Sequence, residues 1–184
     1  MILGVVLCGG KSTRMGQDKA GLVHEGRTWL QIMTGLLFAC GVDQVSYAGR
    51  PDLPSGFSDR FPGIGPLGGL LTSIETAPAN THCLVVVPVD MPCLSVICLR
   101  ELVETCCLSM VPVHFQPTPL PLALPLRAAS RAAITSAAHA AVKSGGYSLK
   151  RLLHGLGGIE LPDPGGNILQ NLNSPEDLAI LPRN

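Results

Sequence analysis

Two short, almost unbroken apolar runs constrain the fold of this chain more than any other feature. They cover residues 2–8 and 83–89; two glycines close the first run and Asp90 closes the second. Strands that are buried on both faces have this composition, and they occur in parallel sheets whose two faces are covered by helices. The runs therefore predict an α/β protein.

The rest of the chain alternates between helical and strand-like patterns. Helices are expected at residues 29–37, 70–76, 96–103, 127–143 and 149–156. Further strands are expected at residues 44–48, 109–114 and 120–126. This alternation predicts one domain over residues 1–184, with a three-layer α/β/α, Rossmann-like architecture and a mainly parallel sheet. The ligand site of such a fold lies at the carboxyl ends of the strands.

Charge and cysteine content exclude several functional classes. The 13 basic and 13 acidic side chains cancel without forming a run of either sign, which argues against a broad surface for nucleic acid or membrane lipid. The seven cysteines form an odd set without a C-x-x-C spacing and lie mostly in apolar stretches, so buried, reduced thiols of a cytoplasmic protein are expected. No signal peptide or membrane span is expected. The five histidines lack metal-ligand spacing and are expected on the surface or on helix faces.

The loop that follows the first apolar run is the first candidate site. It reads LCGGKSTRMGQDK over residues 7–19. Glycines let the backbone turn sharply and bring its N–H groups near an anion, while Arg14 and Lys19 can neutralise phosphate charge. A solvated glycine loop is the alternative interpretation. A P-loop is disfavoured, because that motif needs glycine where this chain has Val5.

Two more segments carry residues suited to a nucleotide site. PVDMP places Asp90 directly after the most strand-like segment, where a carboxylate can hold Mg²⁺ and the metal can bridge phosphate oxygens. GPLGGL follows Asp59 by six residues. Each segment also has a purely structural interpretation. The first can simply end a strand, and the second can be a turn that leads into a helix.

In combination, these segments resemble the molybdenum cofactor guanylyltransferase family. VVLCGGKSTRMGQDKAGL is similar to the LxGGxxxRMGxDK loop that wraps the phosphates and base of a nucleoside triphosphate in that family. GPLGGL is similar to its GPLAG segment, PVDMP to its P-x-D-x-P segment, and NLNSPEDL to its N-x-N-T/S-P-E-D/E-L ending. The four segments occur in the family's order and extend over residues 4–181.

The resemblance implies roles for individual residues. Arg14, Lys19 and Asp90 would be catalytic, Asp90 as the magnesium ligand, and Asp59 would contact the guanosine. The implied nucleotide contacts are Leu7, Cys8, Gly9, Gly10, Lys19, Asp59, Gly65, Gly69 and Asp90. Asn171 and Asn173, spaced to share one strand face, are candidates to contact the cofactor substrate.

The activity implied by the resemblance is transfer of GMP from GTP to the phosphate of molybdopterin or the molybdenum cofactor, with Mg²⁺ as cofactor. Transient contact with molybdenum-cofactor proteins is expected, and no nucleic-acid or membrane partner. Three alternatives stay open: a relative that uses CTP or another small acceptor, a non-catalytic nucleotide-binding relative, and a P-loop kinase.

The chain departs from the family pattern in two places. Residues 45–50 read VSYAGR where the family has N-x-N, so a polar contact to the base is either missing or supplied by backbone. Residues 113–125 are more apolar and richer in proline than the family's substrate loop. The first departure concerns the nucleotide end of the site and the second its acceptor end.

Overall fold

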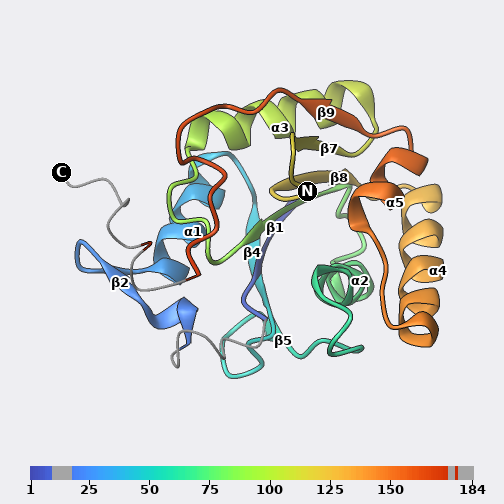
Figure 1. The fold of residues 1–184 in the computed structure, drawn as a ribbon, viewed down its shortest axis with the longest axis horizontal. Coiled ribbons are helices and arrows are strands. Elements are labelled where there is room, and N and C mark those ends of the chain that lie inside the picture. The colour runs from blue at the N-terminus through green and yellow to red at the C-terminus, as the bar shows by residue number, and fades with distance from the viewer. Residues whose placement is uncertain (10–17, 174–176, 178–184) are drawn as a thin grey trace.

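A central β-sheet organises the fold (Figure 1), which a computed structural model describes for residues 1–9, 18–173 and 177. Within these residues the main sheet has the strand order β5-β4-β1-β6-β8-β7-β9. Its strands are β1 (Ile2–Leu7), β4 (Gln44–Ala48), β5 (Gly56–Phe57), β6 (Cys83–Pro88), β7 (Val113–Phe115), β8 (Leu122–Pro125) and β9 (Ile159–Leu161). A small antiparallel pair, β2 (Val23–His24) and β3 (Arg27–Thr28), stands apart from it.

The sheet is mainly parallel, as the sequence predicts. β5, β4, β1 and β6 run parallel to one another, whereas β8 runs antiparallel to both β6 and β7. β7 and β9 pair in parallel at the far edge. In the register of β6 with β8, Val86 lies opposite Leu122. The end of β6 and the start of β8 therefore lie at the same edge of the sheet.

Helices cover both faces of the sheet and complete the expected three layers. Helices α1 (Trp29–Ala39) and α3 (Val96–Ser109) pack on one face, and α2 (Pro66–Thr76), α4 (Ala128–Ser144) and α5 (Leu149–Gly155) on the other (Figure 1). Strand β6 shows why its sequence is a continuous apolar run. Val85 and Val87 belong to one hydrophobic core, while Leu84 and Val86 belong to the other.

Side-chain caps and glycines set several helix ends. Helix α1 begins with a capping box in which Thr28 Oγ1 accepts from the Gln31 backbone N–H and the Gln31 side chain accepts from the Thr28 N–H. Ser148 caps α5 as expected, because its hydroxyl oxygen accepts from the Arg151 N–H. Helix α4 ends at Gly145, whose φ of 75° is in the left-handed region that glycine tolerates.

Some expected boundaries were wrong. The strand expected over residues 109–114 begins only at Val113, because helix α3 continues as far as Ser109. Cys106, in the last turns of that helix, is buried in the core. Met110, with a φ of 57°, closes that helix. Helix α2 begins at Pro66 rather than at residue 70, since proline suits the first turn of a helix. The single domain over residues 1–184 stays a prediction.

Two expectations about burial need correction. Cys40, Cys83, Cys98 and Cys106 are buried and Cys8 and Cys93 partly buried, but Cys107 is exposed on α3. His114, expected on the surface or on a helix face, is only 1% exposed, because β7 lies inside the sheet between β8 and β9. Among the helices that the structure describes, none is both long and apolar enough to cross a bilayer.

Candidate active site

A cleft of about 1170 Å³ lies where the parallel strands end at their carboxyl termini. Cys8 and Gly9 follow β1, Gly49 follows β4, and Asp90 follows β6, so the cleft is at the predicted edge of the sheet. Sites for a single small ligand usually measure about 300–1,000 Å³, so this cleft has room for a nucleotide and an acceptor together.

The cleft brings together most of the site residues that were predicted from the sequence. Its lining includes Leu7, Cys8, Gly9, Lys19, Asp59, Gly65, Gly69, Asp90, Asn171 and Asn173. Gly10 and Arg14 lie outside the described residues. The structure therefore gathers ten nominated residues, drawn from distant parts of the chain, around one cavity.

Backbone atoms form the floor of the cleft between β1 and β4. The Cys8 N–H donates to the Ala48 carbonyl oxygen at 3.0 Å. Gly49 has a φ of 82°, and a Cβ placed on it would lie 3.0 Å from the Gly9 nitrogen. A side chain at residue 49 would be strained by the positive φ and would press on Gly9, so glycine at this position permits the close approach of the two segments. Tyr47 is not available there, since its hydroxyl oxygen lies 3.3 Å from Thr34 Oγ1 on α1.

Lys19 links the two opposite sides of the cleft. It begins the short 3₁₀ helix η1 (Lys19–Gly21), whose N-cap Asp18 accepts from the Ala20 N–H through its side chain. Lys19 Nζ donates to Asp90 Oδ2 at 2.8 Å and to Asn173 Oδ1 at 2.6 Å. The Lys19 and Asp90 side chains are 15% and 18% exposed, so this ion pair is partly shielded from water.

The two asparagines reach the cleft in an unexpected conformation. The described residues after β9, from 162 to 173, include no strand, so the expected strand carrying Asn171 and Asn173 is wrong. The expected alternation of side chains over residues 171–173 still holds. Leu172 is fully buried, whereas the asparagines on either side of it line the cleft. The Leu172 N–H donates to the Asp90 carbonyl oxygen at 2.8 Å. An anchored extended segment thus presents both amides on one side.

Asp59 has a buried oxygen that lacks a partner. Its Oδ1 makes no hydrogen bond to the part of the chain that the structure describes. Burial raises the pKa of the Asp59 carboxyl group above its usual value. A Cβ on Gly9 would lie 3.3 Å from Asp59 Oδ2, and one on Gly69 would lie 3.4 Å from Asp59 Oδ1. The glycines leave room around a carboxylate that needs hydrogen-bond donors.

Cys8 lines the cleft as a neutral thiol and does not act as a nucleophile. Burial raises the pKa of the Cys8 thiol to about 12, so the thiol stays protonated at neutral pH. Because the thiolate is the nucleophilic form of cysteine, this environment does not suit covalent catalysis. The thiol is one of the half-buried groups next to the glycine loop.

Arg50, which was not predicted as a site residue from the sequence, lies beside the residue that precedes Lys19. Arg50 follows β4, and its NH1 lies 3.1 Å from Asp18 Oδ2 while its NH2 lies 2.7 Å from Asp52 Oδ2. The bond to Asp52 raises the Arg50 pKa and lowers the Asp52 pKa. The signal in the sequence was an arginine directly after the strand whose N-x-N is lost. Arg50 anchors the residue just before Lys19.

Comparison with known proteins decides the family. A family model described as MobA-like NTP transferase domain matches residues 4–158. The chain belongs to the MobA-like NTP transferase family. It is therefore a nucleotidyltransferase, and the cleft lies within the matched region except for the two asparagines.

Relatives agree with this assignment. A molybdenum cofactor guanylyltransferase from Xanthomonas euvesicatoria is 43% identical over 157 residues, which cover 83% of this chain and 78% of that protein. Molybdopterin-guanine dinucleotide biosynthesis protein A from Archaeoglobus fulgidus matches with a TM-score of 0.74 at 18% identity, over 96% of this chain and 95% of that one.

The same fold also occurs in a protein with a different name. The 4-diphosphocytidyl-2C-methyl-D-erythritol synthase from Anaerococcus prevotii has a TM-score of 0.70 at 9% identity, with 97% of this chain and 92% of that chain covered. The fold of the MobA-like family is thus shared with distant proteins.

A divalent metal fits the donor groups of this MobA-like site. In the part of the chain that the structure describes, no group of three or more His, Cys, Asp or Glu side chains could hold a metal by itself. Mg²⁺ is commonly held by one or two carboxylates together with substrate phosphates. Asp90 is a carboxylate at the cleft, and Lys19 Nζ lies 2.8 Å from its Oδ2. The arrangement suits a metal that enters with the nucleotide.

Proposed function

We propose that this chain transfers GMP from GTP to the phosphate of molybdopterin or the molybdenum cofactor and releases pyrophosphate. The name of the relative that is 43% identical supports this reaction, and the two parts of the site support it independently. Lys19 and Asp90 form a charged centre for phosphate chemistry, and the cleft is large enough for both substrates.

The choice of guanine rests on the unpaired oxygen of Asp59. Guanine carries two adjacent donors, N1–H and N2–H₂, and a carboxylate can accept both at once. Cytosine offers a single donor group, N4–H₂, on the corresponding edge. Because Asp59 Oδ1 is buried without a partner among the described residues, binding guanine satisfies a group that cytosine would satisfy less well. Asp59 therefore favours GTP over the CTP alternative.

The phosphates are assigned to the glycine loop and Lys19. Cys8 and Gly9 line the cleft, and Lys19 Nζ lies 2.8 Å from Asp90 Oδ2. Asp90 would hold Mg²⁺, which supplies charge neutralisation of the triphosphate when it is bound. Arg14, outside the described residues, is assigned to the same phosphates from the sequence resemblance.

The chemical step requires alignment more than acid–base catalysis. An acceptor phosphate oxygen forms a bond to the α-phosphorus of GTP, the bond from that phosphorus to the bridging oxygen breaks, and pyrophosphate leaves. The acceptor phosphate is already ionised at neutral pH, so no residue needs to remove a proton. Lys19 binds the phosphates and neutralises the charge that builds up during transfer.

The proposed location of this reaction is the cytoplasm, where reduced thiols such as those of this chain are stable. GTP and molybdopterin are the substrates, and proteins that supply or receive the molybdenum cofactor would be transient partners. Nucleic acid and membrane lipid have no role in this reaction.

Pyrophosphate release tests the proposal directly. Purified protein is mixed with Mg²⁺ and GTP, with or without metal-free molybdopterin, and pyrophosphate and the dinucleotide product are measured. The expected result is release only with the acceptor, in equal amounts with the product. GTP consumption without the acceptor, or none with it, would contradict the proposal.

Replacing GTP by CTP in the same assay tests the base. Faster transfer from GTP supports the role of Asp59, and equal or faster transfer from CTP would favour the alternative substrate. Competition between the two nucleotides in a direct binding assay separates their affinities from their rates.

A further inference from the structure

One wall of the cleft carries no residue assigned to the nucleotide. Strand order places β1 and β4 on one side of β6, and β8 and β7 on the other. The assigned nucleotide residues come from the first side and from α2, with Asp90 at the end of β6. The loop between β7 and β8, residues 116–121, forms the wall on the other side through Thr118, Pro119 and Leu120. That wall borders the space left for the acceptor.

A buried histidine holds this loop from beneath. His114 Nδ1 lies 2.9 Å from the Thr118 carbonyl oxygen and 3.1 Å from the Phe115 carbonyl oxygen. Carbonyl oxygens only accept hydrogen bonds, so Nδ1 must carry the hydrogen. The side chain of His114 is 1% exposed. Its buried donor is therefore shared between the Phe115 carbonyl at the end of β7 and the Thr118 carbonyl in the loop, and a loop that moved away would lose the shorter of the two bonds.

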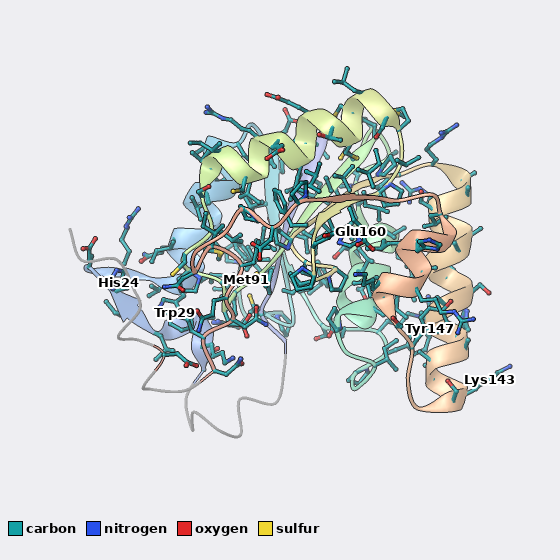
Figure 2. The ribbon with its side chains drawn as sticks, turned by 45° about the horizontal axis from the view of Figure 1, so that its top comes forward. His24, Trp29, Met91, Lys143, Tyr147 and Glu160 are labelled. Carbon is teal, nitrogen blue, oxygen red and sulfur yellow. The ribbon has the colours of Figure 1, made fainter. Side chains whose placement is uncertain are left out.

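The other ring nitrogen faces strand β9. His114 lies opposite Glu160 in the parallel pairing of β7 with β9, and its Nε2 is 3.9 Å from Glu160 Oε1. Lys150 Nζ on α5 lies 3.2 Å from Glu160 Oε2. Figure 2 labels Glu160 on this part of the sheet. The imidazole thus lies between Glu160 on β9 and the loop, and the hydrogen bonds that hold it are those of Nδ1.

The loop is also ordered internally at the residue that His114 holds. The Thr118 hydroxyl donates to the Leu120 carbonyl oxygen at 3.0 Å and accepts from the Leu120 N–H at 3.3 Å. A shift of the Thr118 backbone would therefore carry Leu120 with it. The bond from His114 thus reaches two of the three cleft-lining residues of the loop, Thr118 directly and Leu120 through the Thr118 hydroxyl.

We propose that His114 is a positioning residue that keeps the β7–β8 loop in the shape that receives the acceptor substrate. The inference rests on the proposed function, because the acceptor is the molybdopterin phosphate of that reaction. His114 itself does not line the cleft, so its effect is transmitted through the Thr118 carbonyl. Nucleotide binding takes place on the other side of Asp90 and does not need this bond.

Two substitutions of similar size separate positioning from folding. His114→Asn places an amide N–H near the position of Nδ1, whereas His114→Gln places one near Nε2. The exposed His154→Asn is the matched control. Pyrophosphate release is measured at saturating GTP over a range of metal-free molybdopterin, the GTP Kd is measured by calorimetry, and Tm is recorded for each variant.

The expected result is a split between the two substrates. His114→Gln raises the KM for molybdopterin about tenfold, the size of one lost hydrogen bond, with the GTP Kd unchanged. His114→Asn keeps the molybdopterin KM close to the wild-type value. Equal KM values for the two variants, or a parallel rise in the GTP Kd, would overturn the inference.

A variant of the loop itself covers the case in which His114→Gln does not fold. Thr118→Ala removes both hydroxyl bonds from a half-buried position and leaves the core intact. It should raise the molybdopterin KM and leave the GTP Kd unchanged; an unchanged KM would overturn the inference. If the wild-type protein fails to use molybdopterin at all, the proposed function falls and takes this inference with it.

Discussion

At the scale of single residues, the contact of Lys19 with Asp90 and Asn173 is the centre of the site. The partners are 71 and 154 positions away from Lys19 in the sequence. Their residue types and motifs were visible in the sequence, because glycine loops and strand-terminal carboxylates have a chemical signature. Their contact could not be predicted, because it depends on strand order and on the path of the segment after β9.

Substituting Asp90 tests the metal role. Asp90→Asn keeps the size of the side chain and a hydrogen-bond acceptor for Lys19 but removes the charge. GMP transfer should fall by about a thousandfold or more, as expected for loss of a central charge-stabilising group. Initial rates at saturating substrates check this, with the exposed Glu104→Gln on α3 as a control. A rate near that of the wild type would contradict the assignment.

The charged Asp59 carboxylate should lower the stability of the fold and strengthen GTP binding. Its raised pKa means that the folded protein binds the Asp59 proton more readily than the unfolded chain does. The charged form therefore destabilises the fold above the raised pKa, and this cost disappears as the pH falls through it. Asp59→Asn should raise Tm at neutral pH and weaken GTP binding.

Calorimetry of GTP binding and thermal unfolding across acidic to neutral pH check this pair of effects. The Tm difference between Asp59→Asn and the wild type should shrink as the pH is lowered, because the wild-type carboxyl group becomes protonated. Asp52→Asn is the control, since the Asp52 pKa is lowered and its removal should not raise Tm. Unchanged GTP affinity in Asp59→Asn would remove the basis for guanine selection.

At the scale of elements, the close approach of β1 and β4 defines the floor of the cleft. Gly49→Ala should destabilise the protein by about 1–3 kcal/mol, because Gly49 has a positive φ and a Cβ would press on Gly9. Gly35→Ala on α1 is the matched control. It adds a methyl group where nothing lies within 4 Å, and should stabilise by roughly 0.5–1 kcal/mol.

Chemical denaturation measures both glycine variants. The two substitutions are chemically identical, so opposite signs in the free energy of unfolding isolate the effect of the backbone. GTP affinity should fall only in Gly49→Ala. Equal effects of the two substitutions would contradict the close approach of these strand ends.

Helices and strands with strong sequence patterns were predicted more accurately than those with weak ones. The buried strands β1 and β6 and the helices α1, α4 and α5 were predicted within a residue or two at most ends, since long apolar or alanine-rich patterns are unambiguous. The short pair β2 and β3 and strand β9 were missed. Strands of two or three residues form through their neighbours, which the local sequence does not reveal.

At the scale of the whole molecule, the sheet order places two groups of cleft-lining residues on opposite sides of Asp90. In the proposed reaction, the group on β1, β4 and α2 binds the nucleotide and the β7–β8 loop receives the acceptor. The α/β class and the edge of the sheet that holds the site were predicted from the sequence. The antiparallel β8, which places that loop beside Asp90, was not, because prolines obscured the pattern of residues 111–126.

Ligand-linked stability should report the metal dependence of the intact protein. GTP at a hundred times its Kd, with Mg²⁺, should raise Tm by roughly 5–10 °C. Chelation of the metal should remove most of this shift, because the triphosphate would then face Asp90 without a bridging cation. Thermal unfolding with GTP, with and without chelator, checks this; an equal shift in both cases would contradict a metal-bridged complex.

The central claim is that a magnesium triphosphate binds between the glycine loop and Asp90, with its base at Asp59. A crystal structure with Mg²⁺ and a non-hydrolysable GTP analogue measures this most directly. The predicted result has the phosphates at Gly9 and Lys19, the metal on Asp90 and the guanine donors on the Asp59 carboxylate. A nucleotide bound elsewhere, or a base that does not contact Asp59, would contradict the account.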